Sequence, residues 1–184
     1  EAHSNLGNTL KDLGRLDEAE ASYNQAIELK PDYAEAYSNL GVTLQALERL
    51  DEAEASFTQA IALKPDYPEA HYNLGVTLQA LGKLDEAETS YKQAIALRPG
   101  YAEAHGNLGV TLQALARLDE AEASYKQAIA LRPGFFEAHY NLGSTLKELG
   151  RLDEAEASFT QAIALKPDYA EAHCNLGSTL QALG

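Results

Sequence analysis

The sequence repeats itself every 34 residues. The tripeptide Asn-Leu-Gly returns at this step along the whole chain, starting at Asn5, Asn39, Asn73, Asn107, Asn141 and Asn175. Five of the six prolines keep the same step, with no insertion or deletion between them: Pro31, Pro65, Pro99, Pro133 and Pro167. Units of constant length and nearly constant sequence adopt one shape and stack on one another, so the period decides the fold class.

Each unit has the apolar spacing of two amphipathic helices. In residues 34–67 the first run, at steps of three and four, is Tyr37, Leu40, Leu44 and Leu47. The second run is Leu50, Ala53, Phe57, Ala60, Ile61 and Leu63. Pro65 prevents the second helix from continuing, and the small residues Gly41, Ala53 and Ala60 let the two helices approach closely. The sequence therefore predicts a helical hairpin in every unit.

The predicted fold is all-α, a solenoid of antiparallel helix hairpins with five full repeats and the first helix of a sixth. We expect a single array over residues 1–184, with repeats at 1–33, 34–67, 68–101, 102–135, 136–169 and a partial repeat at 170–184. The chain has no methionine, begins at the second residue of a unit and stops halfway through another. We therefore expect it to be a piece of a longer protein.

The helix ends carry capping and turn residues. Asp51 with Glu54 has the pattern of a capping box for the second helix, and residues 32 and 35 repeat it for the first helix. Three units have a glycine between the helices, where a left-handed residue ends a helix without steric cost: Gly14, Gly82 and Gly150. Glu48 and Ala116 replace this glycine, at an expected cost of about 1 kcal/mol or less each.

The repeat resembles the tetratricopeptide repeat family. In the second unit the signature positions are Tyr37, Leu40, Gly41, Leu44, Ala53, Phe57, Ala60 and Pro65. The other units align without gaps, although histidine stands in most of them where the family favours tryptophan. The resemblance implies a right-handed superhelix whose first helices line a concave groove that binds peptides or proteins. The joins between units look most similar to the repeat region of O-linked N-acetylglucosamine transferase and related bacterial proteins.

The resemblance also assigns residues to the groove. The asparagines of the recurring tripeptide, one in each first helix, form a ladder: Asn5, Asn39, Asn73, Asn107, Asn141 and Asn175. Stacked units place these amides about 10 Å apart, which matches about three residues of an extended peptide, so each amide can bind a peptide group. Alternatively, these asparagines only orient contacts between helices. The other groove residues are Val42, Val76, Val110, Gln45, Gln79, Gln113, Lys11, Lys147, Tyr72 and Tyr140.

No catalytic, metal or cofactor site is predicted. The histidines occur once per unit at the same step of about 10 Å, so no two of them can share a zinc ion, and we expect them to pack against the second helix. The chain has no Gly-rich phosphate loop and no nucleophile elbow. Its only cysteine, Cys174, cannot form an internal disulfide. We expect no enzymatic activity and no cofactor.

The net charge of −14 argues against two classes of partner. A chain of this charge repels nucleic-acid phosphates and anionic lipid headgroups, so neither nucleic acid nor a membrane is an expected partner. No apolar stretch is long enough to span a membrane, and the N-terminus lacks the pattern of a signal peptide. The sequence does not determine the compartment, although it favours the cytoplasm.

Three functions remain open from the sequence. The leading hypothesis is a protein–protein interaction module that binds an extended peptide or a partner helix in the groove. The second is a structural scaffold that forms homo-oligomers by stacking end to end, because the sixth first helix has no second helix to cover it. The third, which the transferase resemblance implies, is a region that positions substrates for a larger transferase.

Overall fold

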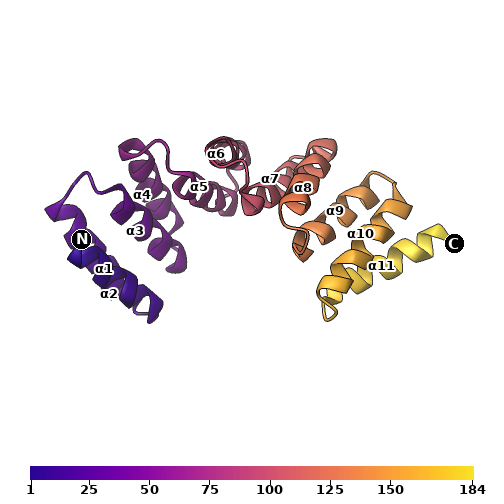
Figure 1. Ribbon diagram of the computed structural model, residues 1–184, viewed down its shortest axis with the longest axis horizontal. Helices are drawn as coiled ribbons and strands as arrows, with labels where there is room; N and C mark the ends of the chain where they lie inside the picture. Colours follow the sequence, from indigo (N-terminus) through magenta and orange to yellow (C-terminus); the bar gives the residue numbers. More distant parts are fainter. The chain divides into compact units, whose positions relative to one another are not determined.

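The computed structural model describes residues 1–184, and all of its regular structure is helical (Figure 1). Two compact units cover residues Glu1–Arg98 and Pro99–Gly184. The first contains α1 (Ala2–Asp12), α2 (Leu16–Leu29), α3 (Ala34–Ala46), α4 (Leu50–Leu63), α5 (Pro68–Ala80) and α6 (Leu84–Leu97). The second contains α7 (Ala102–Ala114), α8 (Leu118–Leu131), α9 (Phe136–Glu148), α10 (Leu152–Leu165) and α11 (Ala170–Leu183). The prediction of an all-α solenoid of helix hairpins is confirmed.

Each hairpin is held together by an aromatic ring of the second helix that lies against a glycine of the first. In the α3–α4 hairpin the ring of Phe57 is fully buried, and a Cβ atom added to Gly41 would lie 2.8 Å from it. The other hairpins repeat this pairing: Gly7 with Tyr23, Gly75 with Tyr91, Gly109 with Tyr125, and Gly143 with Phe159. Ala53 and Ala60 of α4 are fully buried as well. The small residues predicted at these positions therefore allow the close approach of the two helices.

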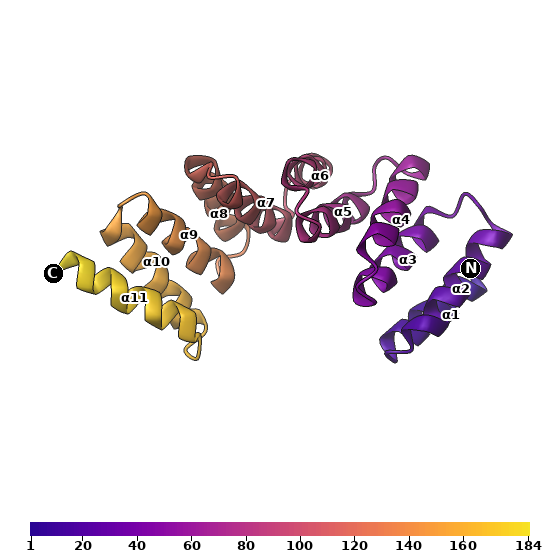
Figure 2. The same cartoon turned by 180° about the vertical axis from the view of Figure 1, so that it is seen from behind.

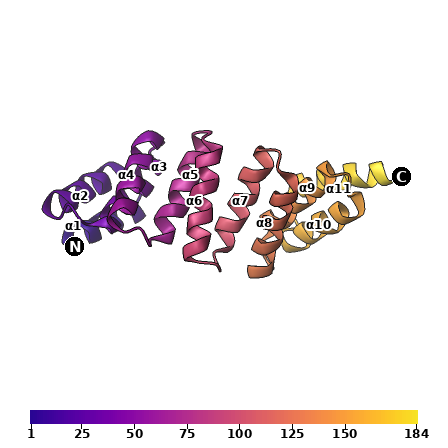
Figure 3. The same cartoon turned by 90° about the horizontal axis from the view of Figure 1, so that it is seen from above.

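Neighbouring hairpins stack in a fixed order within each unit. The second helix of a hairpin contacts its own first helix and the first helix of the next hairpin, as α2 does with α1 and α3, and α8 does with α7 and α9. Neighbouring first helices also contact each other, whereas α2 and α4, α4 and α6, and α8 and α10 do not. The first helices are thus the more closely spaced layer in each unit. Views from behind (Figure 2) and from above (Figure 3) show the same succession of hairpins.

The turn inside each hairpin has the left-handed residue that the sequence predicts. The φ angle is 73° at Gly14 and 75° at both Gly82 and Gly150. Glu48 and Ala116 adopt the same conformation, with φ of 59° and 58°. A left-handed residue with a Cβ atom costs about 1–2 kcal/mol, which is at or above the cost expected from the sequence. Those two turns still close with the same backbone hydrogen bonds, because packing on both sides imposes the geometry.

The predicted capping boxes are wrong. Helix α4 begins at Leu50 after the N-cap residue Arg49, and no side chain caps it. Asp51 therefore lies inside the first turn, where its charge complements the helix dipole instead of accepting a hydrogen bond from the helix end. Glu54 accepts a hydrogen bond from Lys83 of the next repeat. Helix α3 likewise has no side-chain cap, because its N-cap residue is Tyr33 rather than residue 32.

The histidines make a contact that the sequence did not predict. In four repeats the Nε2 atom lies 2.9–3.2 Å from the carbonyl oxygen of the proline six residues earlier: His71 with Pro65, His105 with Pro99, His139 with Pro133, and His173 with Pro167. A carbonyl only accepts hydrogen bonds, so Nε2 is the donor in each pair. The rings are half-buried or exposed. They tie the start of a first helix to the turn before it.

Substituting Gly41→Ala is expected to lower the free energy of unfolding by about 1–3 kcal/mol, because the new Cβ atom would displace the packed ring of Phe57. Gly177→Ala is the matched control, since it changes the same repeat position where no atom lies within 4 Å of an added Cβ. There alanine is expected to stabilise the helix by up to about 1 kcal/mol. Chemical denaturation measures both changes, and equal destabilisation would contradict the role assigned to the ring.

Candidate functional site

The first helices carry a row of polar side chains that link one repeat to the next. We call this row the first-helix surface; it lies on α1, α3 and α5 in the first unit and on α7, α9 and α11 in the second. In the first unit the amide of Asn39 donates to Oδ1 of Asn8 over 3.1 Å. The same oxygen accepts from the hydroxyl of Tyr23 over 2.7 Å. A side chain of the second helix therefore reaches through the hairpin to this surface.

Glutamines extend this row of polar side chains, one to two helical turns after the asparagine on each helix. Nε2 of Gln45 donates to Oγ1 of Thr77 over 2.8 Å and to the backbone oxygen of Asn73 over 3.3 Å, which connects α3 to α5. Oε1 of Gln79 accepts from the hydroxyl of Tyr91 over 3.0 Å. Because the oxygen is turned toward the ring, the NH2 group of Gln79 is directed away from it.

The second unit has an open hollow of about 430 Å³ on the first-helix surface, between α9 and α11. It is lined by Ser144, Lys147, Glu148 and Asn175. Nζ of Lys147 donates to Oγ of Ser178 over 2.7 Å, and Nδ2 of Asn175 donates to the hydroxyl of Tyr140 over 2.9 Å. This hollow has both charge signs and several hydroxyl and amide groups, which suits a polar peptide segment.

Gln113 shows how the glutamines are oriented in the second unit. Its Oε1 accepts from the hydroxyl of Tyr125 over 3.2 Å, and its Nε2 donates to Oε1 of Glu148 over 2.6 Å. One amide thus joins the hairpin core of its own repeat to the next first helix. The polar row is a connected network rather than a set of independent side chains.

The asparagines predicted as a ladder do not share one environment. Asn39 and Asn175 use their amide hydrogens on neighbouring repeats. The side chains of Asn73 and Asn141 are half-buried and make no hydrogen bond, and Asn5 is exposed. Asn107 holds the equivalent position on α7. The six asparagines are therefore divided: some amides join neighbouring helices, and others have no partner within the chain.

The remaining predicted groove residues are half-buried. This group comprises Val42, Val76, Val110, Lys11, Lys147, Tyr72 and Tyr140. Tyr72 packs against the buried ring of Tyr91, with centroids 5.9 Å apart, and Tyr140 lies 5.8 Å from Phe159 and 4.9 Å from Tyr169. Both rings are therefore part of the aromatic packing as well as of the surface.

The tyrosines of the second helices contribute to the candidate site, and sequence reasoning missed them. Tyr23, Tyr91 and Tyr125 donate to an amide oxygen on the first-helix surface. Phe57 and Phe159 stand at the same position and cannot donate. In those two repeats Gln45 and Lys147 donate to the following repeat, as Gln113 also does beside Tyr125. The signal was present as an alternation of tyrosine with phenylalanine at one repeat position.

Burial raises the pKa values of two of these hydroxyls, those of Tyr23 and Tyr125. It raises the pKa of Tyr23 to about 12, with a further contribution from the nearby carboxylate of Asp12. Burial raises the pKa of Tyr125 further still, and Glu148 adds to the effect. Both phenols therefore act as hydrogen-bond donors throughout the physiological pH range.

Two other kinds of site are absent from the structure. No group of three or more His, Cys, Asp or Glu side chains is placed to hold a metal ion. None of the helices combines the length and the apolar character that crossing a membrane requires. Cys174 is exposed on α11 and forms no disulfide.

Comparison with protein families gives matches over most of the chain. A model described as "TPR repeat" matches residues 7–48 and 143–184, and one described as "Tetratricopeptide repeat" matches residues 32–100 and 66–134. A further tetratricopeptide repeat model matches residues 124–157. Comparison with curated proteins gives no significant match.

Several solved structures are similar to this chain. The crystal structure of MamA has a TM-score of 0.83 at 27% identity, covering 90% of this chain and 96% of that one. YrrB, described as a TPR protein with an unusual peptide-binding site, has a TM-score of 0.80 at 28% identity, with 92% and 88% covered. TTC0263, a thermophilic TPR protein of Thermus thermophilus, has a TM-score of 0.72 at 29% identity, with 98% of each chain covered.

The raised tyrosine pKa values predict a loss of stability at alkaline pH. An unfolded tyrosine ionises near pH 10, whereas Tyr23 keeps its proton to about 12. The unfolded chain loses the proton first, so the free energy of unfolding falls as the pH rises from about 10 to 12 and is unaffected by this group below that range. Replacing Tyr23 and Tyr125 by phenylalanine should make the fall shallower in urea denaturation between pH 8 and 12. A slope identical to that of the unsubstituted chain would contradict this assignment.

Proposed function

Because the chain belongs to the tetratricopeptide repeat family, we propose that it is a protein–protein interaction module, without catalytic activity of its own, that binds an extended peptide along the first-helix surface. The observation that carries the proposal is the pair of unpartnered amides at Asn73 and Asn141, one in each unit. A carboxamide can donate to and accept from a peptide group at the same time. Half-buried amides with no partner gain most when a ligand supplies one.

The surroundings of these asparagines favour a peptide backbone over other ligands. Gln79 and Gln113 are held in a fixed orientation by Tyr91 and Tyr125, so the surface is preorganised and little conformational entropy is lost on binding. Val76 and Val110 add small apolar contacts without demanding a particular partner side chain. The similarity to YrrB, whose description includes a peptide-binding site, supports the same interpretation.

Alanine at both unpartnered asparagines should abolish most peptide capture. The probe is a display library of random peptides of about nine residues, long enough to cover the three repeats of one unit at about 10 Å each. Peptides recovered on the unsubstituted chain should bind the Asn73→Ala, Asn141→Ala variant about tenfold more weakly. Asn24→Ala, an exposed asparagine on α2, is the control and should bind unchanged. Equal affinity for the double variant and the control would refute binding along this surface.

Self-association through the repeat ends is the second candidate, and the exposure of end leucines favours it. Leu6 of α1 is 50% exposed, whereas Leu40 and Leu142, its counterparts in inner repeats, are 8% and 7% exposed. Leu180 and Leu183 of α11 are 45% and 41% exposed. Apolar ends of this kind can stack head to tail, and such a contact does not close on itself unless the rotation happens to form a ring.

Charged substitutions at the ends separate this second candidate from the first. If the ends associate, sedimentation should show growth with concentration, and Leu6→Glu or Leu180→Glu should return the chain to a monomer. Leu131→Glu is the matched control, because Leu131 is 43% exposed but lies inside the array. A monomer at every concentration, or the same effect from Leu131→Glu, would eliminate assembly through the ends.

A further inference from the structure

An arginine in the turn of the hairpin joins two repeats through two carboxylates. Nε and Nη2 of Arg49 donate to the two carboxylate oxygens of Glu52, each over 2.6 Å. Its Nη1 donates to Oε2 of Glu20 in the preceding repeat, also over 2.6 Å. The planar guanidinium is suited to this role because its donors are fixed in a fork that matches a carboxylate.

The same arrangement recurs in the second unit. Arg151 donates through Nε and Nη2 to Glu154, and through Nη1 to Glu122 of the preceding repeat. The pair of carboxylates at these repeat positions is thus a receptor for one guanidinium, occupied from within the chain in both cases.

The third repeat breaks the pattern. Lys83 stands where the other four complete repeats have arginine. Its Nζ atom donates to Oε2 of Glu54, the counterpart of Glu20, over 2.7 Å. Glu86, the counterpart of Glu52, makes no hydrogen bond or ion pair through its carboxylate, because the single nitrogen of the lysine ammonium is placed on Glu54 and lacks the fork of donors that Arg49 uses on Glu52. One carboxylate of the receptor is therefore vacant, and Oε1 of Glu54 is unused as well.

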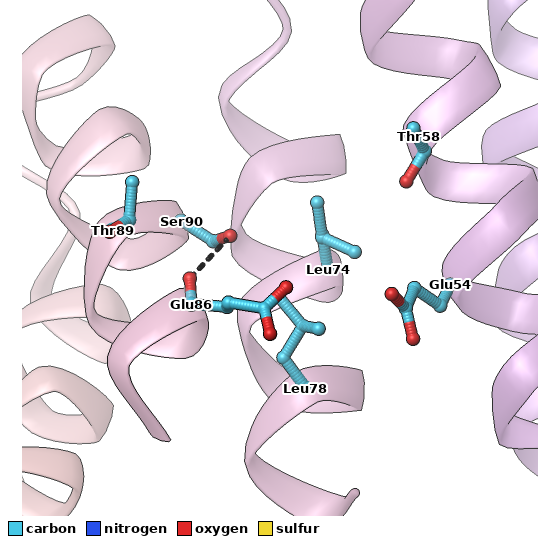
Figure 4. A pocket seen from close by; sticks show the side chains of 7 residues that line it. All are labelled: Glu54, Thr58, Leu74, Leu78, Glu86, Thr89 and Ser90. Carbon is cyan, nitrogen blue, oxygen red and sulfur yellow. Dashed lines mark hydrogen bonds between the residues drawn. The ribbon is translucent and has the colours of Figure 1, made fainter. Parts of the chain in front are cut away.

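A crevice of about 270 Å³ lies at this place, within the first unit. Its walls come from α4 and α6, which do not contact each other, and its floor consists of Leu74 and Leu78 of α5. The carboxylates of Glu54 and Glu86 point toward one another across the space in front of Leu78 (Figure 4). Leu74 is only half-buried, in contrast to the buried Leu40 at the same position of the preceding repeat.

The charge around the crevice is complementary to a cation. The hydrogen bond to Glu54 raises the pKa of Lys83, and Glu86 and Asp51 attract the same ammonium. Three carboxylates therefore face one lysine, and a net negative charge remains after that pairing. The hydroxyl of Thr58 and the two leucines offer a mixed polar and apolar wall for the stem of a long cationic side chain.

We propose that this crevice binds the guanidinium of an arginine side chain presented by a partner protein. The guanidinium takes the place that Arg49 and Arg151 fill in their own repeats, bidentate on Glu86 and with a third N–H on the unused oxygen of Glu54. The aliphatic stem lies over Leu74 and Leu78. The site is on the second-helix side of the molecule, so it is separate from the first-helix surface and does not depend on peptide binding there.

The test is an NMR titration of the whole chain with Nα-acetyl-arginine amide as the probe. The readout is the chemical shifts of the 15N-labelled backbone amides of α6 and of the side-chain carboxylate of Glu86. The expected result is saturable shifts at Glu86, Thr89 and Ser90 that weaken as salt rises. The citrulline analogue, which has the same shape without the charge, should give none, and the lysine analogue should bind more weakly.

Three variants decide the outcome. Glu86→Gln should weaken binding about fivefold, as expected for loss of an exposed ion pair. Glu52→Gln is the matched control, because Glu52 is already occupied by Arg49, and should leave binding unchanged. Lys83→Arg should abolish binding by filling the receptor from within. The proposal is overturned if Lys83→Arg binds the probe normally, if Glu52→Gln weakens binding as much as Glu86→Gln, or if the citrulline analogue gives the same shifts.

Discussion

The contact between an aromatic ring and a glycine inside each hairpin is the interaction on which the rest of the structure depends. A side chain at Gly41 or Gly75 would occupy the space of the ring, so the first helix is drawn against the second only because the glycine has no Cβ atom. The same approach lets the hydroxyls of Tyr91 and Tyr125 emerge beside the glutamines of the first-helix surface. Core packing and the orientation of the candidate site are therefore produced by one side chain.

This link explains how near-identical repeats can offer different surfaces. Where the ring is tyrosine, its hydroxyl holds the amide oxygen of Gln79 or Gln113. Where it is phenylalanine, as at Phe57, no ring hydroxyl holds the oxygen of the neighbouring Gln45, whose amide donates to Thr77 in the next repeat. The exchange leaves hairpin packing unchanged, because both rings fill the same volume against the glycine. A conservative exchange in the core thus decides whether the oxygen of a surface glutamine accepts a hydrogen bond from its own hairpin.

The fold followed from the sequence because its signals are periodic and reinforce one another. Apolar spacing, prolines and turn glycines agree in every unit, and the turn geometry is kept even at Glu48 and Ala116, where packing overrides the residue. The capping boxes failed because a pattern of two acidic residues does not specify which residue begins the helix. A start at Leu50 makes Arg49 the N-cap residue and places Asp51 two positions too late. The site was harder to predict for a similar reason. Repeat position shows that Asn39 and Asn73 lie on the same surface. Whether an amide is hydrogen-bonded depends on a neighbour that is distant in sequence, which for Asn39 is Asn8, 31 residues away.

A departure from the consensus of the repeats can give one repeat a property that the others lack. Exposed ion pairs contribute at most about 1 kcal/mol each, so having Lys83 in place of an arginine costs the array little stability. The array tolerates the loss because each interface is also held by the burial of apolar side chains such as Leu78, which is 3% exposed. The lysine leaves the carboxylate of Glu86 without a pairing side chain from its own chain, beside the apolar floor of the crevice. In a chain whose repeats are otherwise so alike, a single residue is enough to make one interface a receptor.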